Sequence, residues 1–149
     1  MDLLQNELLN SFLQINKALY ALVKEDADRA GLTVVQLKTL YKINQVPAIG
    51  LRELAESQKL TNSTMSGVVD RLVAGGLLLR HTSSADRRAI TLKLTDEGTA
   101  KLAEASGDHS SFKKKFKELD TMSEEAKRAL LHMHSYILSV LTDKEENAQ

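Results

Sequence analysis

Residues 61–76, TNSTMSGVVDRLVAGG, predict a short helix that begins with polar residues and ends at two glycines. Thr61 suits the N-cap position because its hydroxyl can accept a hydrogen bond from a free backbone N–H of the first turn. One face of the helix is apolar and consists of Met65, Val68, Val69 and Leu72. The opposite face carries Ser63, Ser66 and Gly67 where a solvated helix normally carries Lys and Glu. This small-residue face suits close contact with another molecule, and packing inside the chain is the alternative explanation.

The composition limits the class of protein. The chain has 149 residues, which fits one domain, and it has no cysteine, which excludes disulfides and thiolate metal sites. We expect a soluble, cytoplasmic protein, because the sequence has neither a signal peptide nor an apolar run of about 18 residues. The net charge is zero, which argues against a nucleic-acid partner. Residues 71–93, however, hold five basic groups and one acidic group, and a phosphate responds to such a local patch.

A second short helix and a hairpin are predicted around this stretch. Residues 51–57, LRELAES, form a helix before it, and residues 58–60 form the turn between the two helices. Residues 77–81 and 89–94 read as strands, and the second strand alternates apolar and polar residues. The order of helix, turn, helix and hairpin is that of a winged helix-turn-helix, and this order is more specific than any one part.

Longer helices are predicted outside this region. The first runs from about residue 3 to residue 29, with Gly31 as its stop, and the last follows a cap at Ser123. Both carry apolar stripes: Leu8, Phe12, Ile15 and Leu19 in the first, at spacings close to a coiled-coil seam, and Leu130, Ile137 and Leu141 in the last. The first stripe either belongs to the chain's own core or crosses into a partner subunit.

Two further helices lie between these regions. A capping box at residues 33–36 opens one that ends near residue 44. We expect it to direct four side chains toward the core: Val34, Leu37, Leu40 and Tyr41. Residues 95–98, TDEG, open the other, which runs toward Phe112 and Phe116 and is loosened at residues 106–107.

Several short motifs follow one another in a specific order between residues 32 and 98. They are LRELA at 51–55, DRL at 70–72, DRR at 86–88 and LTDEG at 94–98, together with Leu32-Thr33, Gln36, Leu40, Leu60-Thr61 and Gly76-Leu77. In this combination the chain resembles the MarR family of winged helix-turn-helix transcriptional regulators. The resemblance implies a mainly α fold with a small β-hairpin, of α+β class. It implies a DNA-binding lobe at 32–98 and a helical dimerisation region formed by 1–31 and 99–149.

The resemblance also implies the partners. A homodimer would hold two lobes against double-stranded DNA with a pseudo-palindromic operator, and the outer apolar stripes would lie at the dimer base. Repression is the usual outcome in this family, and many relatives bind a small aromatic or phenolic effector. A helical module that uses the winged fold for protein contact is the alternative function.

The predicted DNA contacts divide into three groups. The beginning of the second helix approaches base edges in the major groove, with Asn62, Ser63, Thr64, Ser66 and Gly67. Arg71 and Arg80 are candidates for phosphate contacts, and Arg87 and Arg88 for the minor groove. Only one of the two wing arginines should enter the groove, and the family resemblance favours Arg88. Asp70 would position an arginine, either Arg71 or one from the wing, and Asp86 would order the turn or pair with Arg88.

Other kinds of site have little support in the sequence. His132 and His134 are two residues apart on a helix and point to different faces, while His81 and His109 lack acidic partners at a recognisable spacing. We therefore expect no metal site and no cofactor. No pair of nucleophile and base, glycine-rich phosphate loop or pair of catalytic carboxylates occurs at a meaningful spacing, so we expect no enzyme.

Overall fold

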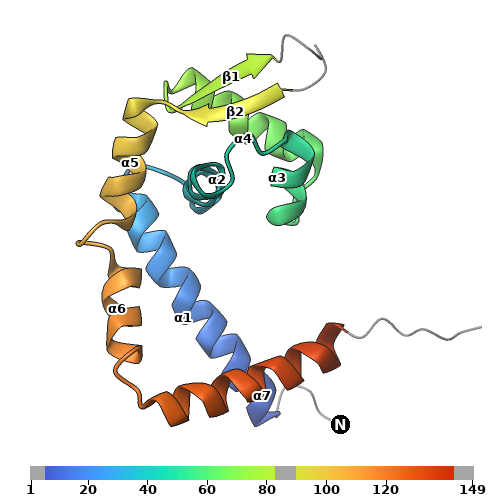
Figure 1. The fold of residues 1–149 in the computed structure, drawn as a ribbon, viewed down its shortest axis with the longest axis vertical. Helices are drawn as coiled ribbons and strands as arrows, with labels where there is room; N and C mark the ends of the chain where they lie inside the picture. Colours follow the sequence, from blue (N-terminus) through green and yellow to red (C-terminus); the bar gives the residue numbers. More distant parts are fainter. Residues whose placement is uncertain (1–5, 83–89, 143–149) are drawn as a thin grey trace, which may run out of the picture. The chain divides into compact units, whose positions relative to one another are not determined.

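The computed structural model describes residues 6–82 and 90–142. These residues divide into two compact units, with the boundary between Lys114 and Lys115. The predicted tip of the hairpin, with Asp86, Arg87 and Arg88, lies outside the described residues. The described elements are α1 (Glu7–Arg29), α2 (Val34–Gln45), α3 (Leu51–Ser57), α4 (Asn62–Ala74), β1 (Leu78–Thr82), β2 (Ile90–Leu94), α5 (Asp96–Ser106), α6 (Ser111–Leu119) and α7 (Glu124–Thr142) (Figure 1). None of these helices is long and apolar enough to cross a membrane.

Helix α2 lies in the middle of the first unit, with α3 and α4 on one side of it and α5 on the other (Figure 1). Its capping box is confirmed, because the Thr33 hydroxyl accepts from the Gln36 N–H while the Gln36 side chain accepts from the Thr33 N–H. Leu40 is fully buried and packs in one cluster with side chains of every neighbouring element, including Leu54, Met65 and Leu78. Burial of this apolar surface is the main force that holds the unit together.

The prediction for Tyr41 is wrong. Its side chain is 49% exposed, while Ile43 is buried. The buried stripe of α2 is centred on Leu40 and Ile43, so Tyr41 lies beyond its edge.

Helix α4 forms as predicted. Thr61 caps it by accepting a hydrogen bond of 3.1 Å from the Thr64 N–H. All four residues of the predicted apolar face, Met65, Val68, Val69 and Leu72, are buried. Gly75 and Gly76 end the helix, and Gly76 has a φ of 74°, which glycine adopts at no steric cost.

The two strands pair in an antiparallel hairpin, with Leu78 opposite Leu94 and Arg80 opposite Leu92. Side chains alternate between the faces of a strand. Leu78 and Leu92 therefore lie on one face and are buried, while Leu79, on the other face, is exposed. The buried face attaches the hairpin to the core of the first unit.

The predicted continuation of α5 toward Phe112 and Phe116 is interrupted. Helix α5 ends at Ser106, Gly107 is extended, and α6 starts only at Ser111. The sequence predicts one helix that is only loosened at residues 106–107, whereas the structure has two separate helices. Ser110 begins α6 by accepting a hydrogen bond of 3.0 Å from the Lys113 N–H.

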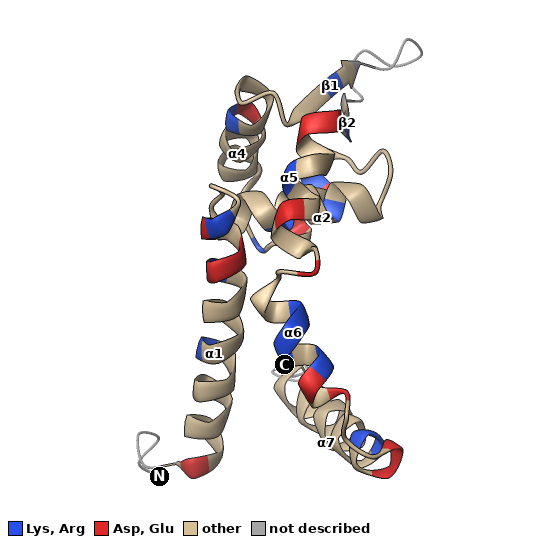
Figure 2. Ribbon diagram, turned by 90° about the vertical axis from the view of Figure 1, so that its left-hand side faces the viewer, with Lys and Arg blue, Asp and Glu red and all other residues tan. Residues whose placement is uncertain are grey.

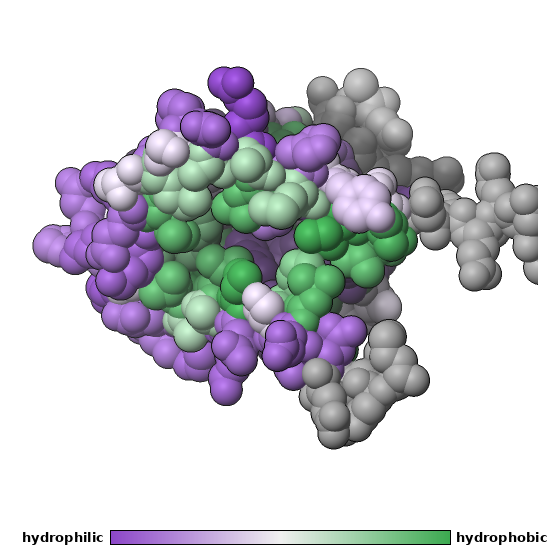
Figure 3. Space-filling model, turned by 90° about the horizontal axis from the view of Figure 1, so that it is seen from below, coloured by the Kyte–Doolittle hydropathy of each residue, from purple (hydrophilic) through white to green (hydrophobic). Residues whose placement is uncertain are grey.

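Helix α7 belongs to the second unit and starts after Ser123, whose hydroxyl accepts from the Ala126 N–H as the sequence predicts. Lys127 bridges the turn before the helix to its first turn through Asp120 and Glu124, at 2.8 and 3.0 Å. Many apolar side chains of α7 are exposed: Leu130, Leu131, Met133, Tyr136, Leu138, Val140 and Leu141. Figure 3 shows apolar residues gathered on the face of the molecule that is seen from below.

The beginning of α5 packs directly on the backbone that joins α4 to β1. The Thr95 hydroxyl donates to the Gly76 carbonyl at 2.6 Å and accepts from the Gly98 N–H at 2.9 Å. A Cβ atom at Gly98 would lie 2.0 Å from the Leu77 carbonyl oxygen. Only glycine permits this approach.

Replacing Gly98 with alanine should therefore destabilise the fold. We expect Gly98→Ala to lower the free energy of unfolding by about 3 kcal/mol, the upper part of the usual range for overpacking. Urea denaturation followed by circular dichroism measures the change. Gly67→Ala is the matched control, because nothing lies within 4 Å of a Cβ at Gly67, and it should stabilise the helix by about 0.5–1 kcal/mol. Equal effects of the two substitutions would contradict the packing argument.

Candidate nucleic-acid interface

The outer face of α4 is small, polar and uncharged over its first half. Asn62, Ser63 and Thr64 are exposed, and Ser66 and Gly67 are partly exposed. The structure brings all five predicted base-contacting residues to one end of one helix. The only charged residues in α4 are Asp70 and Arg71, both exposed near its far end (Figure 2).

Packing within the described chain does not explain why residue 67 is a glycine. A Cβ atom at this position would meet no atom within 4 Å. A glycine inside a helix costs about 0.5–1 kcal/mol relative to alanine. The described chain offers no internal compensation for this cost, so an external contact is the better explanation.

The first turn of α4 presents hydrogen-bond donors to solvent. The Thr61 hydroxyl accepts from the Thr64 N–H and donates to Thr64 Oγ1 at 2.9 Å. The Thr64 hydroxyl therefore keeps its own proton for an outside acceptor. Free N–H groups and the positive end of the helix dipole lie at the same point, which is a favourable arrangement for a phosphate.

The turn between α3 and α4 is held to the core by a buried hydroxyl. Thr39 in α2 is fully buried, donates to the Val35 carbonyl at 2.7 Å and accepts from the Gln58 side-chain amide at 2.8 Å. Met65 Sδ of α4 lies 3.9 Å from the same hydroxyl. One side chain therefore contacts α2, the turn and α4. Sequence analysis missed it because neither Thr39 nor Gln58 stands in a recognisable motif.

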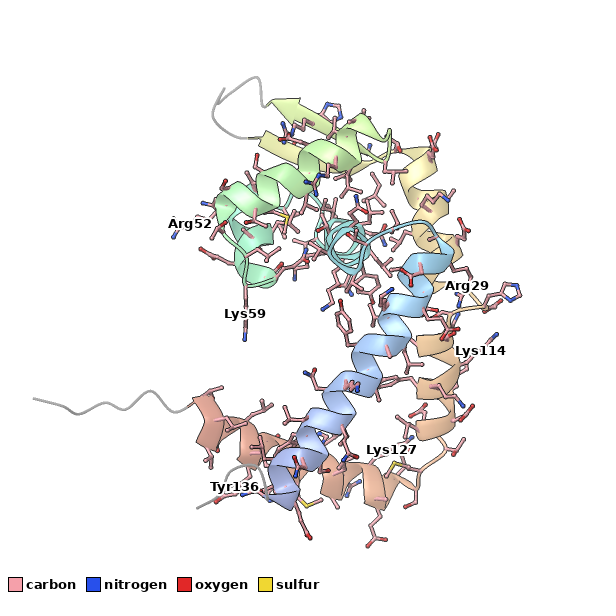
Figure 4. The ribbon with its side chains drawn as sticks, turned by 180° about the vertical axis from the view of Figure 1, so that it is seen from behind. Arg29, Arg52, Lys59, Lys114, Lys127 and Tyr136 are labelled. Carbon is pink, nitrogen blue, oxygen red and sulfur yellow. The ribbon has the colours of Figure 1, made fainter. Side chains whose placement is uncertain are left out.

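The same turn contains an unusual backbone conformation. Lys59 has a φ of 54°, and the N–H groups of Lys59 and Leu60 donate to the Glu56 and Ala55 carbonyls at the end of α3. This left-handed closure of a helix end is most often made by glycine. The Lys59 side chain is exposed and extends away from α3 and α4 (Figure 4).

Asp70 holds an arginine, as predicted, and the partner is Arg80 of β1 rather than its neighbour Arg71. The Arg80 guanidinium donates to the Asp70 carboxylate at 2.5 Å. Arg80 lies on the same strand face as the buried Leu78, so it reaches back toward α4. Both side chains are substantially exposed, at 36% and 57%, so the pair adds about 1 kcal/mol or less to stability. It joins the outer end of α4 to the hairpin and neutralises the carboxylate there.

A buried carboxylate that sequence analysis did not single out anchors α6. Asp26, near the end of α1, accepts from the Ser110 hydroxyl and from the Ser111 and Phe112 N–H groups at 2.6, 2.6 and 3.1 Å. Arg29 donates to the same carboxylate at 3.0 Å, and it lies at the end of α1 beside the start of α6 (Figure 4). Asp26 thus supplies an acceptor for free N–H groups of a helix that begins 85 residues later.

Replacing the Thr39 hydroxyl should loosen the turn between α3 and α4. Thr39→Val removes the acceptor of the Gln58 amide, so we expect the free energy of unfolding to fall by about 1–2 kcal/mol. Thr99→Val is the matched control, because Thr99 makes the same type of bond to the carbonyl four residues earlier but is exposed. Its cost should stay below about 0.5 kcal/mol. Similar losses in chemical denaturation would contradict the role of Thr39.

The Asp26 anchor should make stability depend on acid pH. Burial raises the pKa of Asp26, but hydrogen bonds from Ser110, Ser111, Phe112 and Arg29 outweigh burial and hold the pKa below its usual value. The stabilisation is therefore complete above the ordinary aspartate pKa of about 3.9 and is lost as the pH falls through the lower pKa of the folded state.

Asp26→Asn should remove this part of the pH dependence. At neutral pH we expect the variant to lose about 2–3 kcal/mol of unfolding free energy, since hydrogen bonds to a charged acceptor are lost. Denaturation curves between neutral pH and pH of about 3 measure both effects. Asp28→Asn is the control, because Asp28 is exposed and pairs only with Lys24 among the described residues. A parallel fall in both proteins would exclude Asp26 as the cause.

Comparison with known proteins agrees with this architecture. The family model described as "MarR family" matches residues 32–90. The HTH-type transcriptional repressor MdtR of Bacillus subtilis is 27% identical over 124 residues, which cover 83% of this chain and 79% of that protein. Such relatives are transcriptional regulators.

Solved structures share the fold. Staphylococcus aureus MarR, in complex with salicylate and kanamycin, has a TM-score of 0.76 at 18% identity, covering 96% of this chain and 95% of that one. The transcriptional repressor CouR, bound to a 23-mer DNA duplex, has a TM-score of 0.72 at 24% identity, covering 92% and 95%. The chain is therefore similar to the MarR family over residues 32–90, the part that holds the winged helix-turn-helix, and it shares its fold with the solved structures.

Proposed function

We propose that this protein is a sequence-specific DNA-binding transcriptional regulator, and that it has no enzymatic role. One observation carries the proposal: the first half of α4 presents an uncharged face of small polar residues that packing does not require, next to a hairpin joined to the same helix by Asp70 and Arg80. A helix of this kind enters the major groove with its first residues toward base edges. The DNA-bound CouR structure, which has the same fold, supports the proposal.

We assign the contacts by the chemistry of each side chain. Asn62, Ser63 and Thr64, with Ser66 and Gly67, face the bases. Gly67 has no side chain, so its contribution is close approach rather than direct readout. Arg71 contacts phosphate, and Arg80 does so with the N–H groups that Asp70 leaves free. Arg87 and Arg88 belong to the wing, with Arg88 in the minor groove and Asp86 ordering the turn.

We propose that the protein acts as a homodimer on a pseudo-palindromic operator. The predicted dimerisation stripes support this, because Leu8 and Ile15 of α1 are 62% and 53% exposed and Leu141 of α7 is 72% exposed. Phe12, Leu19 and Ile137 are partly exposed, and Leu130 is exposed. Burying so many apolar side chains against a second subunit would be favourable in free energy. On this view residues 1–31 and 99–149 form the dimer base and residues 32–98 form the DNA-binding lobe.

The family relatives suggest the regulatory outcome. MdtR is a repressor, and S. aureus MarR forms a complex with salicylate. We propose that this protein represses its target and is released by a small aromatic or phenolic molecule. It would act in the cytoplasm, the compartment that holds the DNA in bacteria such as those of the relatives.

Binding to DNA fragments selected from a genomic library tests the function. Wild-type protein should shift a pseudo-palindromic duplex, and the affinity should fall steeply with salt as counterions are released. Failure to shift any fragment would favour the alternative, a helical module that uses the winged fold for protein contact.

Arg88→Ala tests the wing in the same assay. The substitution should weaken operator binding and reduce the slope of log affinity against log salt by about one unit. Lys101→Ala is the control, because Lys101 lies on α5 and pairs with Glu104. An unchanged affinity and slope for Arg88→Ala would remove Arg88 from the interface.

A further inference from the structure

Arg52 of α3 is an exposed cation that the proposed contacts do not include. Its side chain is 83% exposed, and Figure 4 shows it projecting outward from α3 and α4. Helix α3 is held against α4, because Leu54 and Ala55 are buried in the same cluster as Met65. Arg52 therefore has a fixed place on the helix that packs against the proposed base-reading helix.

The Arg52 guanidinium is held through one of its three nitrogens. Its Nε donates to Glu56 Oε1 at 2.9 Å. Among the described residues Arg52 makes no other hydrogen bond, so the N–H groups of both Nη atoms remain available. Two such groups form a planar fork that matches two oxygens of a phosphate. Glu56 thus orients the guanidinium without using the donors that a phosphate requires.

The pair of Arg52 and Glu56 contributes little to the fold. The Glu56 side chain is also exposed, at 64%, and exposed pairs four residues apart on a helix add little to stability. Neither side chain belongs to the apolar core. Replacement of Arg52 should therefore leave the fold intact, so that a change in binding can be attributed to the lost guanidinium.

Charges are few in this part of the helix-turn-helix. Residues 51–69 hold four, which are Arg52, Glu53, Glu56 and Lys59. Glu53 lies about 100° around the helix from Arg52, so it faces a different direction. Lys59 extends away from α3 and α4 (Figure 4), and the next cation, Arg71, lies in the last turn of α4. Within residues 51–69, Arg52 is therefore the cation best placed to neutralise a phosphate.

We propose that Arg52 contacts a phosphate of the operator, and that Glu56 is the positioning residue that presents its Nη groups. In a helix-turn-helix the first helix crosses the DNA backbone while the second enters the major groove, and α3 is the first helix here. A phosphate contact fixes the protein on the duplex and is independent of base sequence. The inference rests on the proposed function, and it adds α3 to the contacts of α4 and the hairpin.

Operator binding by Arg52→Gln, measured over a range of salt concentrations, tests the proposal. We expect the affinity to fall about tenfold, the effect of losing one charge-assisted hydrogen bond. The slope of log affinity against log salt should fall by about one unit. Lys59→Gln is the matched control, because it removes a cation of the same motif that extends away from α3 and α4. It should bind as wild type does, and equal losses in the two variants would overturn the assignment.

Arg52→Lys separates the charge from the fork. The variant keeps the positive charge, so its salt slope should match that of the wild type. Its affinity should lie between those of the wild type and Arg52→Gln, because an ammonium group lacks the planar fork. If Arg52→Lys loses as much slope as Arg52→Gln does, the loss does not come from a phosphate contact.

Binding to an unrelated duplex distinguishes a phosphate contact from a displaced α4. Loss of a phosphate contact weakens binding to the operator and to unrelated DNA by about the same factor. A reduced preference of Arg52→Gln for the operator would therefore overturn the assignment. If wild-type protein binds the operator and Arg52→Gln matches its affinity and slope, the inference about Arg52 alone fails. If wild-type protein binds no DNA, the proposed function fails with it.

Discussion

The contact between the apolar face of α4 and the core around α2 is the constraint on which the rest of the first unit depends. Met65, Val69 and Leu72 are almost completely buried, and Leu40 of α2 lies in the same cluster. Because one face is buried in this way, the opposite face must point outward. The Thr39 hydroxyl and the Gln58 amide add a directional bond at the turn, where apolar packing alone would allow sliding.

Polar contacts then fix the later elements of the same unit. The Thr95 cap and the close approach at Gly98 attach α5 to the backbone beyond α4. Asp26 attaches the start of α6 to the end of α1, and its carboxylate accepts four hydrogen bonds. The Asp26 bonds are buried or partly buried, which makes them more effective than the exposed ion pairs elsewhere on the described chain.

A net charge of zero is compatible with a DNA-binding surface when charges are sorted locally. Helix α4 brings a nearly neutral face, and its one carboxylate is paired with Arg80. The other cations of residues 71–93 are Arg71 near the end of α4, Lys93 of β2, and Arg87 and Arg88, which lie outside the described residues. Under the proposed function, the helix would supply fit and Arg87 and Arg88 would supply charge, so sequence preference and affinity would have partly separate sources.

The sequence by itself determined the local elements and their order. Residue period, caps and glycine stops identified α2, α3, α4 and the hairpin to within a residue or two, because these depend on neighbours in the chain. The sequence also predicted that Asp70 pairs with an arginine, but it did not identify which arginine. Only the tertiary structure decided that Arg80 is the partner, that Tyr41 faces solvent, and that Thr39 and Asp26 bind segments 19 and 85 residues away. Contacts between distant segments depend on how whole helices pack, which no local pattern encodes.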